Sequence, residues 1–95
     1  MGLSMSKNMT QADWRQMLQR LIKAEMSRRG VKYQDLSEKL AEVGVQQSAD
    51  NLRNKVNKGI LGADLLLQIV FVLNTPQIKR SEIVNIFDAM GIKTE

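Results

Sequence analysis

Apolar residues recur every three or four positions along most of this chain, a spacing that is typical of amphipathic α-helices. Thr10, with Asp13 three residues later, is a helix-start signal, and Gly30 is a helix-stop signal. Between these signals, the apolar positions are Trp14, Met17, Leu18, Leu21, Ile22 and Met26. The pattern therefore predicts a first helix over residues 12–29 whose apolar stripe faces the core.

Two shorter helices are predicted next. Residues 33–43 have one apolar face, which is formed by Leu36, Leu40 and Val43. Gly44 follows directly and predicts the end of this helix. We expect a third helix over residues 48–58, because Ser48 is a favourable N-cap and Gly59 is a favourable helix end.

Two more helices are predicted in the C-terminal part. Residues 63–73, ADLLLQIVFVL, are apolar on nearly every side, so we expect them to form the central and most buried helix. Asn74 suits a left-handed helix end. Thr75 and Pro76 form a cap followed by proline at the first helical position, which predicts a fifth helix reaching Met90. One face of this helix carries Ile83, Ile86, Phe87 and Met90.

The composition fits a single all-α domain and restricts its chemistry. The 95 residues include no cysteine and no histidine, which excludes disulfides, thiol nucleophiles, imidazole bases and the common zinc ligand sets. No apolar run approaches the roughly 20 residues that span a bilayer. We therefore expect a cytoplasmic protein with a flexible tail at residues 1–9 and one compact five-helix domain at residues 10–92. No membrane contact, metal, cofactor or small-molecule ligand is indicated.

The charge distribution favours an anionic partner. The chain has a net charge of +4, and the excess is concentrated between Arg15 and Lys58, where ten Lys or Arg residues face five Asp or Glu residues. Nucleic acid is the commonest partner of such a basic region.

The third predicted helix has an unusual polar face. At about 100° per residue, Ala49, Leu52 and Val56 fall together on the inner side. The opposite side carries Gln47, Asn51, Asn54 and Lys58. Amide side chains can pair bidentately with adenine, whereas Lys and Arg serve guanine or phosphate. Asparagine is a poor helix former, so its repeated use suggests a function for the amides, although an ordinary solvated face remains an equal alternative from this pattern alone.

The order of motifs resembles the Cro and phage-repressor type of helix-turn-helix domain. The stretch RGVKYQDLSEKL is similar to that family's entry into its second helix, and Gly44–Val45 to its turn. KVNKG is similar to the end of its recognition helix, and the apolar run to Leu73, closed by Asn74, to its fourth helix. NLRNKVNKG and the leucine-rich helix that follows are also similar to a small bacterial family of unknown function. The phage-repressor resemblance covers about residues 16–75 and implies sequence-specific binding of double-stranded DNA by a transcriptional regulator.

The resemblance also implies roles for individual residues. The side chains that would face base edges in the major groove are Gln47, Ser48, Asn51 and Asn54. Those that would contact backbone phosphates are Lys32, Tyr33, Lys55 and Lys58. Arg28 and Arg29 would either add phosphate contacts or complement the dipole of their own helix. Asp50 would either accept from a cytosine amino group or help the helix to start.

An enzyme is not expected from these residues. The carboxylates Asp35, Glu38 and Glu42 fall on one side of the second helix, which would in principle suit a metal. Lys39 lies among them, and we interpret the group as a solvated acidic face.

A protein-binding module with the same fold and no DNA binding is the main alternative. Ile60 and Leu61 lie between two glycines, where an apolar surface would be exposed. Repressor-like domains often form homodimers through their last helix, which would make Ile83, Ile86, Phe87 and Met90 a dimer face. Packing of the same face against the first helix is the other interpretation.

Overall fold

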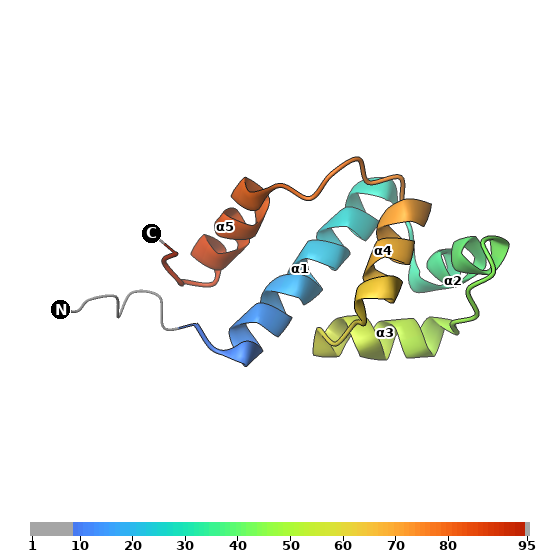
Figure 1. The fold of residues 1–95 in the computed structure, drawn as a ribbon, viewed down its shortest axis with the longest axis horizontal. Helices are drawn as coiled ribbons and strands as arrows, with labels where there is room; N and C mark the ends of the chain where they lie inside the picture. Colours follow the sequence, from blue (N-terminus) through green and yellow to red (C-terminus); the bar gives the residue numbers. More distant parts are fainter. Residues whose placement is uncertain (1–8, 95) are drawn as a thin grey trace.

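The computed structural model describes residues 9–94, which form five helices and no strand. The helices are α1 (Gln11–Arg29), α2 (Tyr33–Glu42), α3 (Ala49–Lys58), α4 (Ala63–Val72) and α5 (Arg80–Ala89) (Figure 1). The all-α prediction is thus confirmed for this part of the chain. The predicted tail at residues 1–9 lies outside the described residues except for Met9.

Most helix ends follow the sequence signals. The Thr10 hydroxyl accepts a hydrogen bond from the backbone N–H of Asp13 at 3.1 Å, and the Asp13 carboxylate accepts one from the N–H of Thr10 at 2.9 Å. The Ser48 hydroxyl likewise accepts from the N–H of Asn51 at 3.1 Å. Each side chain satisfies a backbone donor that the first turn of a helix leaves without a partner.

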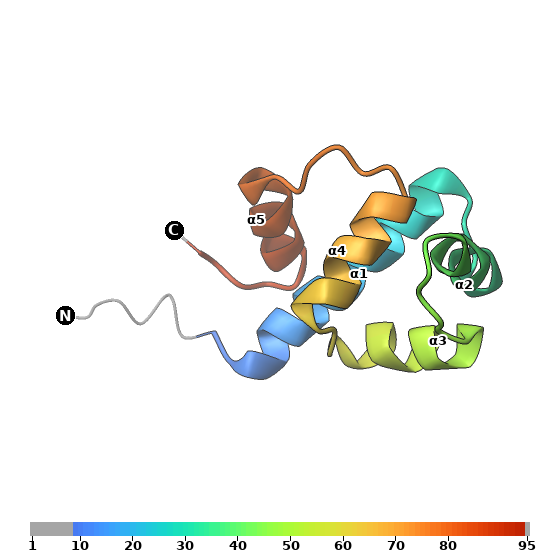
Figure 2. The ribbon, with the colours of Figure 1, turned by 45° about the vertical axis from the view of Figure 1, so that its right-hand side comes forward.

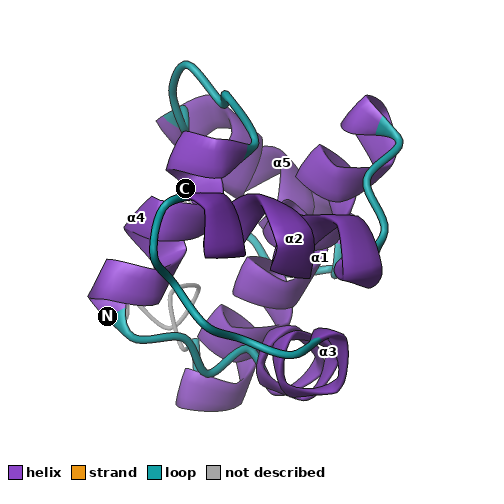
Figure 3. Ribbon diagram, turned by 90° about the vertical axis from the view of Figure 1, so that its right-hand side faces the viewer, coloured by secondary structure: helices purple, strands orange, loops and turns teal. Residues whose placement is uncertain are grey.

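Helices α1 to α4 share one apolar core. α2 packs against α3 and α4, and α1 packs against α3 (Figure 3). The buried members of this core are Ile22, Met26, Leu36, Leu40, Leu52, Val56, Leu65, Ile69 and Leu73. Because α3 contributes only Leu52 and Val56, its other side is left for solvent.

Gly59 allows the end of α3 to lie directly on α1. It has a φ of +64°, and a Cβ atom built there would lie 2.1 Å from the backbone oxygen of Arg15. No other residue type fits this approach without moving one of the two helices. The stop signal that ends α3 therefore also fixes α3 on α1.

Helix α5 packs on the opposite side of α1 and forms a second, smaller apolar cluster. Its buried members are Met17, Leu21 and Phe87. The Phe87 ring meets Trp14 edge to face with 4.9 Å between centroids. Ile83, Ile86 and Met90 pack against the same cluster, so the face predicted to form a dimer packs within the monomer. A dimer through this face stays a prediction and would require α5 to share or leave its site on α1.

The prediction that residues 63–73 form the most buried helix is wrong. Within α4, only Leu65 and Ile69 are buried, whereas Leu67 and Phe71 are 67% and 69% exposed. In Figure 2 the helix lies in front of α1, on the side of the bundle that faces the viewer. Its inner side packs into the shared core, and no other described element covers its outer side.

The predicted start of the fifth helix is also wrong, because α5 begins at Arg80 and not near Pro76. The Thr75 hydroxyl, which was expected to cap the helix, donates instead to Glu25 Oε1 at 3.0 Å. Residues 75–79 form an extended connection (Figure 1). This connection carries the chain from the end of α4 to the far side of α1. Extended chain spans more distance per residue than a helix does, so a helix that began at Pro76 would need more residues to reach the same place.

Candidate nucleic-acid interface on helix α3

The outward side of α3 has the polar composition that the sequence pattern predicts. Leu52 and Val56 are fully buried, and the opposite side chains of Asn51, Asn54 and Lys58 are exposed. We call these three residues the amide–lysine face.

Gln47 and Ser48 lie at the N-terminal edge of α3, and both already make internal hydrogen bonds. The Ser48 hydroxyl caps the helix and retains its own hydrogen as a donor. The Gln47 side-chain oxygen accepts from Lys55 Nζ at 3.4 Å, and the Gln47 backbone oxygen accepts from the Ser37 hydroxyl at 2.6 Å. The predicted base contact of Gln47 is therefore restricted to its amide N–H groups, and Lys55 is only partly exposed.

Asp50 is paired with Arg53, one turn later on the same helix, at 2.6 Å. The Arg53 guanidinium also lies over the Tyr33 ring, 5.3 Å from its centroid, in cation–π geometry. Arg53 therefore connects α3 with the start of α2, a role that the helical wheel does not reveal. The three-residue spacing of Asp50 and Arg53 was the available signal for the ion pair.

Lys32 and Tyr33, at the start of α2, lie in different environments. Lys32 has an exposed side chain, and its backbone N–H donates to Asp35 Oδ2 at 2.9 Å. The Tyr33 ring packs against the main core, and its hydroxyl is buried with no hydrogen-bond partner among the described residues. This burial raises the pKa of Tyr33 above 10.0, and the nearby Arg53 charge opposes the rise. A phosphate contact by the Tyr33 hydroxyl would require the side chain to move.

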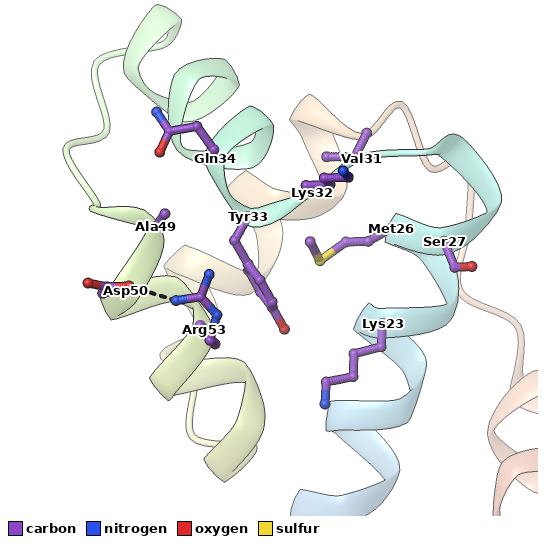
Figure 4. Close-up of a pocket in the computed structure, with 10 residues that line it drawn as sticks. All are labelled: Lys23, Met26, Ser27, Val31, Lys32, Tyr33, Gln34, Ala49, Asp50 and Arg53. Carbon is purple, nitrogen blue, oxygen red and sulfur yellow. Dashed lines mark hydrogen bonds and ion pairs between the residues drawn. The ribbon is translucent and has the colours of Figure 1, made fainter.

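A groove of about 700 Å³ lies between α1, α2 and α3 beside this edge of the interface (Figure 4). We call it the α1–α3 groove. Its lining residues are Lys23, Met26, Ser27, Val31, Lys32, Tyr33, Gln34, Ala49, Asp50 and Arg53. The residues that α3 contributes to the groove differ from those of the amide–lysine face, so the two surfaces occupy different sides of the same helix.

Arg28 and Arg29 belong to an ion-pair network at the end of α1. Both guanidinium groups pair with the buried carboxylate of Glu25, with Arg29 Nη1 at 2.7 Å from Glu25 Oε1. Arg28 also reaches Glu82 of α5 at 2.7 Å. Arg29 Nη2 donates to the backbone oxygen of Asn74 at 3.3 Å. These contacts hold α5 and its connection to α1, which gives the two arginines a structural role that the sequence pattern did not predict.

The described residues form neither a metal-binding cluster nor a membrane-spanning helix. Between Met9 and Thr94, no group of three or more Asp, Glu, Cys or His side chains is placed to hold a metal ion. No helix in this range is both long and apolar enough to cross a bilayer.

Comparison with known proteins places the chain in a family but gives it no activity. No curated protein and no solved structure matches it. A family model described as a domain of unknown function, DUF6471, matches residues 14–78. This match covers nearly all of α1, the whole of α2 to α4 and most of the connection to α5, and it agrees with the similarity to a small family of unknown function. The chain belongs to the DUF6471 family.

Proposed function

We propose that this protein binds double-stranded DNA and inserts the outward side of α3 into the major groove. The observation that carries the proposal is the amide–lysine face: Asn51, Asn54 and Lys58 are exposed together on a helix whose other side is buried. A ten-residue helix is about 15 Å long, and the major groove accepts an α-helix. In this proposal α2 and α3 act as a helix-turn-helix of the repressor type, with residues 43–48 as the connection.

The proposed contacts divide into base recognition and backbone positioning. Asn51 and Asn54 present free amides that suit adenine, and Gln47 and Ser48 extend this surface at the start of the helix. Lys58 and Lys32 have exposed ammonium groups for phosphates on the two sides of the groove. Lys55 joins them once a phosphate replaces its bond to Gln47. A regulator of this size would use two copies on half-sites about 34 Å apart.

Binding to labelled duplex DNA at several salt concentrations tests the proposal. We expect selection from a random duplex pool to yield a preferred sequence, and the logarithm of the binding constant to fall with the logarithm of salt by about 0.9 per phosphate contact. The Asn54→Ala variant should lose about 1–3 kcal/mol on the preferred sequence only. The Lys58→Ala variant should weaken binding to all sequences alike.

Matched controls come from exposed residues of the same types elsewhere in the chain. Asn85→Ala on α5 and Lys93→Ala after it should leave binding unchanged. The proposal fails if no binding to duplex occurs at about 50 mM salt, or if the two control variants weaken binding as much as Asn54→Ala and Lys58→Ala do.

A protein-binding module is the second candidate, and the exposed side of α4 favours it. Leu67 and Phe71 are large apolar side chains one turn apart, and both are mostly exposed. Ile60, in the preceding loop, is 51% exposed, whereas its neighbour Leu61 packs on the core. Large exposed apolar side chains that cluster on one helix are typical of protein interaction sites.

Sedimentation at rising protein concentration tests the second candidate in its simplest form, self-association. A concentration-dependent increase in mass that Phe71→Ser abolishes, together with absent DNA binding, would support it. A protein that stays monomeric at all concentrations and binds DNA would exclude self-association and leave DNA binding as the remaining candidate.

A further inference from the structure

The α1–α3 groove has the size and the walls of a small-molecule site. Its volume of about 700 Å³ falls within the range of roughly 300–1,000 Å³ that is usual for ligand pockets. Met26 of α1, Val31 before α2 and Ala49 of α3 give it apolar walls, and the Tyr33 ring lies among them (Figure 4). Such walls favour an organic ligand with an apolar body.

The charged groups of the groove favour an anion. Three cationic residues line it, namely Lys23 of α1, Lys32 before α2 and Arg53 of α3, against the single carboxylate of Asp50. Asp50 is already paired with Arg53. Among residues 9–94, no carboxylate lies within ion-pairing distance of the Lys23 or Lys32 ammonium group. Two cations in the groove therefore have no carboxylate partner. Lys23 Nζ donates to the Gln19 side-chain oxygen at 3.1 Å and keeps further N–H groups for a negatively charged ligand.

The Tyr33 hydroxyl supplies a donor in the same region. It is buried and makes no hydrogen bond to another described residue, and a buried donor without a partner is costly. Figure 4 shows Tyr33 between Arg53 of α3 and Met26 and Lys23 of α1, with its hydroxyl and the Lys23 ammonium group both directed into the gap between the two helices. Because the hydroxyl is buried, an acceptor in this gap would satisfy both groups only after the Tyr33 side chain turns toward it.

We propose that the α1–α3 groove binds a small aromatic carboxylate. The carboxylate pairs with the Lys23 ammonium group, and the ligand ring packs against Met26 and Val31. The Tyr33 side chain turns out of its buried position and donates its hydroxyl hydrogen to the same carboxylate. Lys32 adds a second positive charge at the rim. The ligand would touch α3 at Ala49, on the side away from the amide–lysine face. This binding goes beyond DNA recognition and does not rest on it.

The probe is 2-naphthoate, and its uncharged isostere 2-naphthamide is the matched control ligand. Titration of protein labelled with ¹³C at the methionine methyl groups reports the position directly. We expect saturable shifts of the Met26 methyl signal, while the Met17 signal, which belongs to the second cluster, stays in place. The amide should bind at least about tenfold more weakly, because it forms no ion pair with Lys23.

Three variants define the contacts. Tyr33→Phe removes only the hydroxyl and keeps the ring in the core, so it should fold normally and bind 2-naphthoate about three- to tenfold more weakly. Lys23→Met keeps the apolar stem of the side chain and should weaken binding by a similar factor. Lys39→Met removes the same charge from α2 outside the groove, and its affinity should equal that of the unmodified protein.

Several results would overturn the assignment. These are equal affinity for 2-naphthoate and 2-naphthamide, unchanged affinity in Tyr33→Phe, or absence of saturable binding. A loss in Lys39→Met as large as that in Lys23→Met would also count against the groove, because it would indicate a general effect of net charge. The experiment contains no DNA, so its outcome is separate from that of the DNA-binding test.

Discussion

Helices α3 and α4 have the same length and each buries two apolar side chains, but the exposed side chains of α3 are polar and those of α4 are mostly apolar. Each has ten residues and buries two apolar side chains four positions apart, Leu52 and Val56 in α3 and Leu65 and Ile69 in α4. The exposed side of α3 carries amides and cations, and that of α4 carries Leu67 and Phe71. Each helix therefore buries little of its surface, and most of the remaining positions are open to a partner.

The contrast matches the two proposed kinds of partner, one for each helix. Amide and ammonium groups can form hydrogen bonds with base edges and phosphates, whereas apolar side chains gain free energy only when another apolar surface excludes water from them. The amide–lysine face therefore suits DNA, and the outer side of α4 suits a protein. Variants that alter one helix without the other can separate these two roles.

The largest effect is expected at the contact that fixes α3 on α1. Gly30 and Gly59 both end helices with a φ of +64°, but a Cβ atom would meet nothing within 4 Å at Gly30 and would collide with the Arg15 backbone at Gly59. Gly30→Ala should cost about 1–2 kcal/mol, the price of the left-handed conformation alone. Gly59→Ala should cost about 4 kcal/mol or more, because α3 or α1 must also shift. Urea unfolding of both variants measures the difference, and equal losses would show that α3 is not held in this way.

The next effect tests the two sides of α4. Leu65→Ala leaves a cavity in the shared core and should cost about 3 kcal/mol. Leu67→Ala, two residues later, changes only an exposed side chain and should alter the free energy of unfolding by less than about 0.5 kcal/mol. Thermal or urea unfolding of both variants measures the two changes in the free energy of unfolding. A large loss in Leu67→Ala would mean that the outer side of α4 is covered, by a second copy or by another part of the chain.

The helix boundaries could be predicted from the sequence wherever a side chain near the end makes the bond that the signal implies. Thr10 and Ser48 cap α1 and α3 as expected, and Gly30 and Gly59 end them. Thr75 carries an equally good signal, but its hydroxyl bonds to Glu25, which is 50 residues away in sequence. A local rule cannot foresee a competing acceptor brought in by tertiary packing.

The candidate site could be predicted only in part, for a related reason. The periodicity of α3 correctly separates Leu52 and Val56 from Asn51, Asn54 and Lys58, because both sets lie on one helix. The α1–α3 groove combines residues from three helices and has no signature in any one of them. The exposure of Leu67 and Phe71 was missed because apolar composition indicates what a helix could bury, not whether a neighbour is present to bury it.

A smaller effect distinguishes the two helices by function. In the DNA-binding assay, Lys58→Ala should weaken binding by about 1 kcal/mol or less, the usual size of a solvent-exposed ion pair. Phe71→Ser on α4 should leave DNA binding unchanged, because its side chain lies outside the amide–lysine face. Fluorescence anisotropy at one fixed salt concentration measures both. A loss of DNA binding in Phe71→Ser that accompanies a loss of self-association would instead join the two surfaces in one dimeric function.

The smallest effect concerns Tyr33, which lies under Arg53 on the flank of α3. Burial raises the pKa of Tyr33 in the folded protein above the ordinary tyrosine value of 10.0, and the Arg53 charge opposes this rise without cancelling it. The unfolded chain therefore releases the Tyr33 proton at a lower pH than the folded protein does. The stability that comes from the neutral phenol is complete below pH 10 and is lost as the pH rises from there through the folded pKa.

Tyr33→Phe isolates this contribution, because phenylalanine keeps the ring but has no proton to lose. Melting temperatures of the two proteins should run parallel up to about pH 10, and the unmodified protein should then fall faster. All other ionisable groups are the same in the two proteins, so the difference between the two curves isolates Tyr33. Parallel curves up to pH 11 and beyond would show that the phenol is solvated, and that the flank of α3 is as open to water as its amide–lysine face.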